Sequence, residues 1–231
     1  MTLDINKNIS KVKKHVNRSA KEAGTNPDDI EIVAVTKTVE ADVIKEAINH
    51  GITSIGENRV QELVKKYEII GDKVKWHMIG HLQRNKVKYI IDKVSLIHSL
   101  DSYRLAVEIN KRAKNKDLVM PCLLQVNISG EESKHGVKAE ETEELLRKIG
   151  LLEHVAIMGL MTIAPYTQNP EETRKYFRAL REMSENIREK KIKNITMKYL
   201  SMGMSNDFEV AVEEGGNLIR VGSKIFGERS Y

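Results

Sequence analysis

EIVAVTKTVEADVIKEAINHGITSIG, residues 31–56, contains one complete strand–helix–strand unit and sets the expectation for the whole chain. The short β-branched run Glu31–Thr36 is typical of a buried strand. Ala41–His50 has the pattern of a helix that Gly51 closes, and Ile52–Gly56 predicts a second strand. Two strands joined by a helical crossover of this length are expected to lie parallel in one sheet.

The same alternation continues along the chain. Further strands are predicted at Lys75–Ile79, Ser95–Ser99, Met120–Asn127, Ala156–Met161, Tyr199–Met202 and Leu218–Val221. Helices are predicted at Ile5–Ala23, before the first strand, and at Asn85–Lys93, Ser102–Lys114, Glu140–Ile149, Glu171–Lys190 and Phe208–Glu214. Eight buried strands alternating with helices in 231 residues predict a closed (β/α)8 barrel.

An open, doubly wound parallel sheet is the alternative architecture. The dinucleotide-binding form of that fold has G-x-G-x-x-G after its first strand, and Thr36–Glu40 contains no glycine. No linker rich in proline, glycine or serine divides the sequence. We therefore expect residues 1–231 to form one α/β barrel domain preceded by an extra N-terminal helix.

The composition is that of an ordinary globular protein, with 40% hydrophobic and 31% charged residues. A single cysteine, Cys122, excludes an intrachain disulfide and any metal site with several thiolate ligands. Residues 1–20 lack the apolar run of a secretory signal, and no segment is apolar enough to span a membrane. A cytoplasmic location is expected, and the net charge of +5 does not by itself predict a nucleic-acid partner.

Lys37 directly follows the first predicted strand. In a (β/α)8 barrel, the C-terminal ends of the strands form a shared mouth where chemistry takes place. A lysine amine at such a position can form a Schiff base with a carbonyl compound. The alternative is a structural lysine whose ammonium group extends to solvent or pairs with Glu57.

The last two predicted strands end in small and hydroxyl-bearing residues. Ser201–Asp207 reads SMGMSND, and Arg220–Ser223 reads RVGS. Backbone N–H groups and hydroxyls at these strand ends are typical of the phosphate-binding loops of barrels. Ordinary helix capping by Ser205 or Asn206 is the alternative.

His77 and His81 are four residues apart, a spacing that suits a metal only on a helix. Here the two histidines straddle a strand end, and the sequence offers no obvious acidic partner. We expect pocket-wall or hydrogen-bonding residues and no metal site.

Taken together, six motifs resemble those of the pyridoxal phosphate homeostasis protein family. The motifs are Ala34–Thr38 (AVTKT), Gly56–Glu62 (GENRVQE), Trp76–Lys86 (WHMIGHLQRNK), Gly159–Thr162 (GLMT), Leu200–Asp207 (LSMGMSND) and Arg220–Gly227 (RVGSKIFG). The resemblance implies a barrel of the alanine racemase N-terminal type that carries pyridoxal 5'-phosphate (PLP).

The resemblance also implies roles for individual residues. Lys37 would hold PLP as a Schiff base, and the phosphate would lie against Ser205, Gly222 and Ser223. Arg220 would face the pyridine nitrogen and keep it unprotonated, because a guanidinium does not readily give up a proton. The other cofactor-binding residues implied are Asn58, His77, Met161, Ser201 and Met204.

The resemblance favours a carrier over an enzyme. Racemases on this barrel add a C-terminal β-domain that supplies a catalytic tyrosine, whereas here four residues follow Gly227. Racemisation requires a proton donor on each face of a planar carbanion, and the sequence suggests only Lys37. We expect no catalytic residues and a monomer that acts in intracellular PLP homeostasis, with PLP-dependent apoenzymes as recipients and no nucleic-acid or membrane partner. A PLP-dependent amino-acid racemase that uses Tyr231 or a pocket histidine is the alternative.

Overall fold

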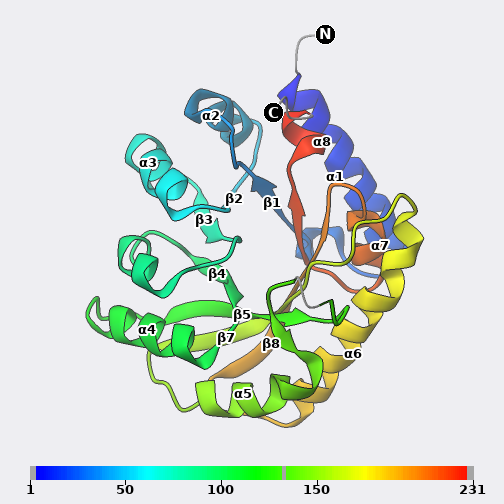
Figure 1. The fold of residues 1–231 in the computed structure, drawn as a ribbon. Coiled ribbons are helices and arrows are strands. Elements are labelled where there is room, and N and C mark those ends of the chain that lie inside the picture. Colours follow the sequence, from blue (N-terminus) through cyan, green and yellow to red (C-terminus); the bar gives the residue numbers. More distant parts are fainter. Residues whose placement is uncertain (1–3, 132–133, 228–231) are drawn as a thin grey trace.

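The protein was analysed as a computed structural model, which describes residues 4–131 and 134–227. Its centre is a closed barrel of parallel strands in the order β1-β2-β3-β4-β5-β7-β8-β9, with β9 paired back to β1 (Figure 1). The barrel strands are β1 (Glu31–Val35), β2 (Ser54–Glu57), β3 (Lys75–Met78), β4 (Leu96–Leu100), β5 (Met120–Asn127), β7 (Val155–Met161), β8 (Ile195–Met204) and β9 (Leu218–Val221). A two-residue strand, β6 (Val137–Lys138), pairs with β5 outside the barrel. The predicted (β/α)8 barrel is confirmed, and the β1–β9 pairing rules out an open sheet.

Helices surround the strands (Figure 1). The α-helices are α1 (Ile5–Glu22), α2 (Ala41–Asn49), α3 (Val60–Ile70), α4 (Tyr103–Lys114), α5 (Thr142–Ile149), α6 (Arg174–Glu189), α7 (Phe208–Glu213) and α8 (Ser223–Phe226). Short 3₁₀ helices are η1 (Pro27–Asp29), η2 (Arg84–Tyr89), η3 (Ala139–Glu141) and η4 (Pro170–Thr173). No helix in the described part of the chain is long and apolar enough to cross a bilayer.

The connection between β3 and β4 differs from the prediction. An α-helix over Asn85–Lys93 was expected, but the chain forms η2 and then turns. Val87, Ile90 and Ile91 are buried, so the segment presents the expected apolar side to the core although its backbone is a 3₁₀ helix. Helices α3 and α8 lie where the sequence analysis named none, although Val60 and Leu63 already have helical spacing on the buried side of α3.

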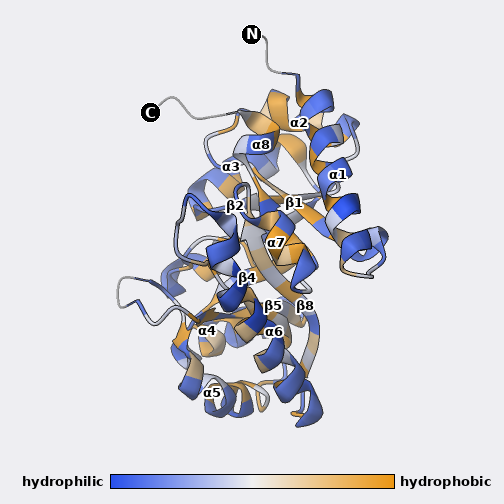
Figure 2. Ribbon diagram, turned by 90° about the vertical axis from the view of Figure 1, so that its right-hand side faces the viewer, coloured by the Kyte–Doolittle hydropathy of each residue, from blue (hydrophilic) through white to orange (hydrophobic). Residues whose placement is uncertain are grey.

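The predicted N-terminal helix is confirmed as α1, which lies against α7 and α8 (Figure 1). Its buried residues include Ile9, Val12 and Val16, whereas its outward side is mostly hydrophilic (Figure 2). Asn8 donates a hydrogen bond from Nδ2 to the Ile225 carbonyl at 3.0 Å. The beginning of the chain is thereby fixed to its last helix.

Two apolar cores support the barrel. The larger core lies between the strands and the helices, and a smaller one fills the barrel interior. The smaller core consists of Val33, Leu96, Leu123, Met161 and Leu218. Met161, one of the predicted cofactor-binding residues, is fully buried in this interior core.

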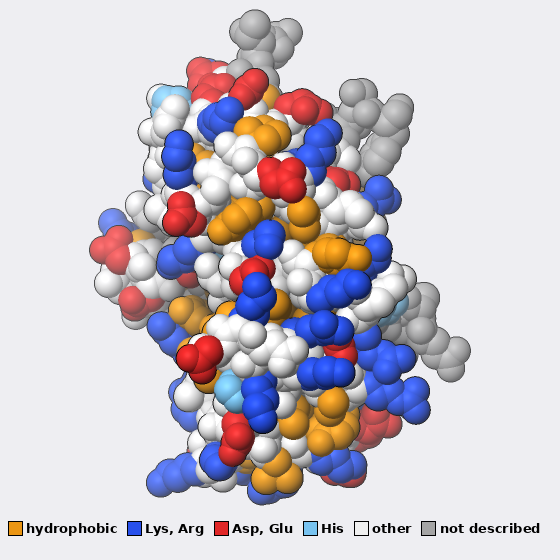
Figure 3. Space-filling model, turned by 90° about the vertical axis from the view of Figure 1, so that its left-hand side faces the viewer, with side chains coloured by type: hydrophobic (Ala, Val, Ile, Leu, Met, Phe, Trp, Pro, Cys, Tyr) orange, Lys and Arg blue, Asp and Glu red, His pale blue; other side chains and the backbone are white. Residues whose placement is uncertain are grey.

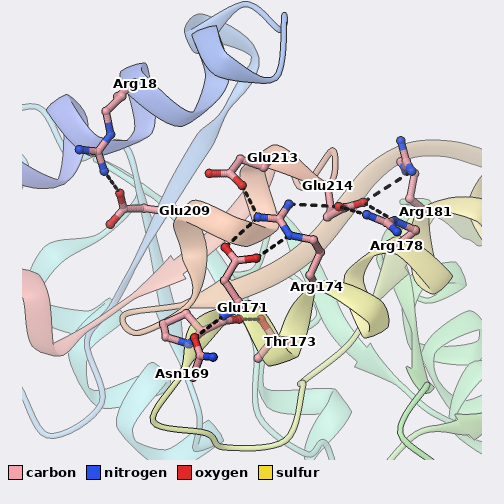
Figure 4. A network of polar contacts seen from close by, with 11 residues as sticks. Arg18, Asn169, Glu171, Thr173, Arg174, Arg178, Arg181, Glu209, Glu213 and Glu214 are labelled. Carbon is pink, nitrogen blue, oxygen red and sulfur yellow. Dashed lines mark hydrogen bonds and ion pairs between the residues drawn. The ribbon is translucent and has the colours of Figure 1, made fainter.

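The junction between α6 and α7 is held by ion pairs (Figure 4). The Glu214 carboxylate, 7% exposed, lies 3.1 Å from Arg174, 3.0 Å from Arg178 and 3.5 Å from Arg181. Burial alone would raise the pKa of Glu214, but hydrogen bonds from Arg178 and Arg174 outweigh this effect and lower it. Because α7 follows β8 directly, this junction also fixes the loop at the end of β8.

The face formed by α2, α3, η2 and α4 carries lysine and arginine side chains interspersed with acidic ones (Figure 3). Lys88 lies over the Tyr89 ring, with Nζ 4.9 Å from the ring centroid. Mixed charge on this face agrees with the small net charge of the chain.

Candidate functional site

The predicted phosphate loops and Lys37 lie on adjoining strands at one side of the barrel mouth. Ser205 follows β8, Gly222 follows β9, and Lys37 follows β1. These three strands are neighbours, because β9 pairs with both β8 and β1. Asn58, half-buried, follows β2, the next strand around the barrel. Barrel closure therefore brings together residues from the first and last parts of the sequence.

Lys37 is half-buried in a tight turn. The next residue, Thr38, has a left-handed backbone conformation with φ of 64°. Its N–H donates to the Glu62 carboxylate at 3.2 Å, and the Val39 N–H donates to the Thr36 carbonyl at 2.9 Å. These bonds stabilise the strained turn on which Lys37 is presented.

A buried ion pair lies directly beneath this turn. Lys66 Nζ donates to the Glu57 carboxylate at 2.7 Å and to the Thr36 carbonyl at 2.7 Å. The Thr36 hydroxyl donates to the same Glu57 oxygen at 2.6 Å. Glu57 is fully buried; this burial raises its pKa, against hydrogen bonds from Lys66 and Thr36 that lower it. In the sequence analysis, Glu57 was an alternative partner for Lys37. In the structure, the Glu57 carboxylate accepts a hydrogen bond from Lys66.

Sequence reasoning missed Lys66, although a signal for it was present. Lys66 lies three residues after Leu63 and four before Ile70, both buried on the inner side of α3. A lysine in an otherwise apolar helical stripe indicates a buried partner.

The two predicted phosphate loops contact each other. The Gly222 N–H donates to the Ser205 hydroxyl at 3.1 Å. Ser223 is exposed beside them as the first residue of α8. Met204, 38% exposed, donates its N–H to the Asp207 carboxylate at 2.6 Å.

The capping alternative for the first of these loops is wrong. Asp207, and not Ser205 or Asn206, occupies the N-cap position of α7. The Ser205 hydroxyl instead faces the loop after β9, where it accepts the Gly222 N–H. It therefore lies beside a backbone donor of the second loop.

Arg220 extends from β9 into the upper barrel interior and is 4% exposed. Its guanidinium donates to the Ser201 hydroxyl and, at 2.8 Å, to the Thr162 carbonyl. Burial lowers the pKa of Arg220 to about 10, so the group is still charged at neutral pH. Two hydrogen bonds to β8 and to the end of β7 fix the direction of the guanidinium plane.

A hydrogen-bonded chain continues from Ser201 through the inside of the barrel. The Ser201 hydroxyl lies 2.8 Å from His98 Nδ1, and His98 Nε2 lies 2.8 Å from His77 Nδ1. His77 Nε2 is 3.8 Å from the Glu31 carboxylate. Burial lowers the pKa of His77 to about 4 and that of His98 well below its usual value, so both rings are neutral.

The direction of this chain fixes both histidine tautomers. At the Glu31 end of the chain, a ring proton on His77 Nε2 faces the Glu31 carboxylate, whereas a lone pair on that nitrogen would face an oxygen lone pair. The proton of neutral His77 is therefore placed on Nε2, and His77 Nδ1 is an acceptor. His98 must then carry its proton on Nε2 and donate to His77 Nδ1. His98 Nδ1 in turn accepts the proton of the Ser201 hydroxyl, and the Ser201 oxygen accepts from Arg220.

The structure places the predicted pocket histidine, His77, inside the barrel, 2% exposed and linked to Arg220 through two side chains. Sequence reasoning missed His98, its direct partner. The signal was a histidine in the middle of the apolar run LIHSL, residues 96–100.

Comparisons with known proteins show the family of this chain. Residues 5–230 match the family model described as alanine racemase, N-terminal domain. The pyridoxal phosphate homeostasis protein of Aquifex aeolicus is 46% identical over 224 residues, covering 96% of this chain and 97% of that protein. The protein of the same name from Escherichia coli K12 is 34% identical, covering 99% and 98% of the two chains.

Several solved structures share the fold of this chain. PipY of Synechococcus elongatus with PLP bound superimposes with a TM-score of 0.80 at 32% identity, covering 92% of this chain and all of that one (100%). A protein of unknown function from Bifidobacterium adolescentis has a TM-score of 0.92 at 33% identity, covering 96% and 94% of the two chains. Alanine racemase from Corynebacterium glutamicum, at 14% identity and a TM-score of 0.69, shares the fold; the match covers 94% of this chain and 61% of that enzyme.

Proposed function

Because the chain belongs to the pyridoxal phosphate homeostasis protein family, we propose that it binds PLP as a Schiff base on Lys37 and serves intracellular homeostasis of this coenzyme. The observation that carries the proposal is the adjacency of Lys37 to the Ser205 and Gly222 loops on β1, β8 and β9. The aldehyde and the phosphate arm of PLP are on neighbouring ring carbons, so an amine and an anion site on adjoining strands fit both at once.

The donor set suits a phosphate. Ser205 and Ser223 offer hydroxyls, and Gly222 offers a backbone N–H that at present bonds to Ser205. Hydroxyl and backbone N–H donors at strand ends are the groups with which barrels bind phosphate. Of the remaining predicted contacts, Asn58 and Met204 lie at the mouth, and Met161 and Ser201 lie deeper inside it.

Arg220 has the chemistry to face a ring nitrogen without protonating it. The pyridine nitrogen lies across the ring from the aldehyde carbon, and therefore points away from Lys37. The Arg220 guanidinium, held between Ser201 and Thr162, remains charged at neutral pH and can only donate a hydrogen bond. An unprotonated ring withdraws electrons weakly, which disfavours carbanion chemistry.

When bound, PLP supplies an aldehyde that condenses reversibly with an amine. The protein's own residues fix the position of Lys37. Lys66 donates a hydrogen bond to the Thr36 carbonyl, and the Thr38 N–H donates one to Glu62, so the turn that contains Lys37 is held at the mouth. A reversible bond allows the coenzyme to be stored and later released to PLP-dependent apoenzymes. We take residues 1–231 as one coenzyme-binding domain, acting as a cytoplasmic monomer without a nucleic-acid or membrane partner.

The carrier role is favoured over a racemase. A racemase needs a second proton donor at the opposite face of the substrate. Of the two predicted pocket histidines, His77 is enclosed in the barrel interior and neutral, so it is not available at the mouth. His81 is exposed after β3, on the other half of the mouth from Lys37, and contacts Asp101. Tyr231, the other residue named for this role, lies outside the described residues.

Borohydride reduction of the PLP-loaded protein, followed by peptide mass spectrometry, tests the proposal. We expect a pyridoxyl group on Lys37, and loss of the visible absorbance of the bound coenzyme in Lys37→Ala. Lys45→Ala, which removes an exposed lysine on α2, is the matched control and should retain the absorbance. Modification at another lysine, or absorbance that persists in Lys37→Ala, would refute the assignment. Incubation with single-enantiomer amino acids tests the racemase alternative.

A further inference from the structure

A second group of side chains lies on the other half of the mouth. His81 follows β3, Asp101 follows β4, and His135 lies between β5 and β6. Strands β3, β4 and β5 are consecutive around the barrel, so their loops meet although 54 residues separate the two histidines in the sequence. The coenzyme contacts proposed above use β1, β2, β7, β8, β9 and buried His77, and leave these three side chains unused.

The three side chains converge. His81 Nδ1 is 3.2 Å from an Asp101 carboxylate oxygen. The rings of His81 and His135 are stacked, with centroids 4.3 Å apart and planes inclined by 13°. One donor atom from each residue can be chosen so that all three lie within 4.8 Å of one another. A tetrahedral zinc ion with bonds of about 2.0–2.1 Å keeps its ligand atoms about 3.3 Å apart, so the His81–Asp101 edge already has the required length.

The backbones that carry these side chains are fixed. Beside His81, Gly80 packs so closely that an added Cβ would lie 2.3 Å from the Asn58 carbonyl oxygen. The His135 carbonyl accepts a hydrogen bond from Gln125 Nε2 at 3.0 Å. Asp101 immediately precedes Ser102, the N-cap residue of α4. The attachment points are therefore held in place, while His81 and His135 remain exposed and can turn.

We propose that His81, Asp101 and His135 form a binding site for a divalent transition-metal ion, with zinc as the representative. Two imidazoles and one carboxylate are a usual ligand set for zinc and leave a fourth position open to water. The Asp101 side chain is only 16% exposed, and a bound cation would compensate its charge.

Binding requires one rearrangement. The lone pairs of an imidazole lie in the plane of its ring, so two nearly parallel rings cannot both point at one ion. We expect the stacked His81 and His135 rings to turn toward each other when the metal binds. The sequence expectation of no metal site considered His77 with His81, but His77 lies inside the barrel and the third ligand comes from a distant loop.

Isothermal titration with zinc, on the full chain freed of metal and of PLP in a phosphate-free buffer, tests the site. We expect one equivalent of zinc, and at least about a tenfold loss of affinity in each of His81→Ala, His135→Ala and Asp101→Asn. His50→Ala, which removes an exposed histidine at the end of α2, is the matched control and should bind as the wild type does. Lowering the pH should weaken binding, because metal binding requires unprotonated imidazoles.

Two measurements keep the result interpretable. Thermal unfolding of each variant shows whether it has folded. Cobalt added in place of zinc should give the visible absorption of a tetrahedral site in the wild type and in His50→Ala, but not in the three ligand variants. Zinc binding should be unchanged in Lys37→Ala, so that a failure of the PLP assignment does not affect this one. Wild-type protein that binds no zinc, or binding of equal strength in folded His81→Ala and His135→Ala, would overturn the proposal.

Discussion

Lys66→Met removes the cation from the buried pair beneath the Lys37 turn. Glu57 would then keep the Thr36 hydroxyl but no longer have the ammonium group 2.7 Å away. Removing one partner of a buried ion pair costs about 3–5 kcal/mol. Since the Lys66 side chain is 11% exposed, we expect the lower value, about 3 kcal/mol. For a chain of this size that corresponds to a fall in melting temperature of about 6–12 °C.

Replacing the acidic partner of the pair should cost less stability. Glu57→Gln leaves Lys66 with the Thr36 carbonyl and with Glu62 at 3.7 Å, so the loss should be about 1 kcal/mol. Replacing both members, as in Glu57→Leu with Lys66→Met, should restore most of the stability, because no charge is then buried without a partner.

The loss in Lys66→Met should also depend on pH. Burial already raises the pKa of Glu57, and without the ammonium group it rises further. A carboxyl whose folded pKa exceeds its unfolded value of about 4.3 favours folding at low pH, and this contribution is lost as the pH rises through the folded pKa. The deficit should therefore be largest at neutral pH and shrink toward about pH 4.

Urea unfolding of the wild type, the two single variants and the double variant, at neutral pH and at about pH 5, measures these effects. A loss below about 1 kcal/mol for Lys66→Met, or a loss that grows as the pH falls, would refute the reasoning. The visible absorbance of added PLP gives a second readout, because Lys66 holds the carbonyl of the residue before Lys37.

Two further predictions concern the barrel interior. Nitrogen-15 NMR of labelled histidines should show His77 and His98 neutral, with the proton on Nε2, down to about pH 5, because burial lowers the pKa of His77 to about 4. A ring proton on Nδ1 would contradict the chain direction, and a charged ring at neutral pH would contradict the effect of burial. Gly159→Ala should destabilise the protein by at least about 3 kcal/mol in urea unfolding, because the φ of Gly159 is 153° and an added Cβ would lie 1.9 Å from the Tyr199 carbonyl oxygen. A variant as stable as the wild type would contradict the close approach of β7 and β8 at this residue.

The parts of the fold and site that could be predicted from the sequence are those with local signals. The run Glu31–Thr36 is apolar and β-branched, and strands of this kind recur with helices between them, so the barrel could be predicted. Lys37 and the two glycine- and serine-containing loops could be identified because each directly follows a strand. Their adjacency then follows from closure of the barrel, which joins β9 to β1.

The remaining features depend on contacts between distant segments. His98 contacts Ser201, 103 residues away, only because β4 and β8 face each other across the barrel interior. Lys66 has a visible signal, a lysine in an apolar stripe, but its partner is set by how α3 packs on β2. Between β3 and β4, the prediction of an α-helix was wrong although Val87, Ile90 and Ile91 are buried at helical spacing, because apolar spacing alone does not separate an α-helix from the 3₁₀ helix that forms.

The pairing of the last strand with the first has a consequence during synthesis on the ribosome. Until Leu218–Val221 has been synthesised, β1 has no strand partner on one side, and the turn that contains Lys37 lies beside an unpaired strand edge. Contacts of such long sequence separation form late. A nascent or C-terminally truncated chain would therefore contain Lys37 but lack the Gly222 loop. Under the proposed function, PLP uptake would begin only once residues 218–223 have been added.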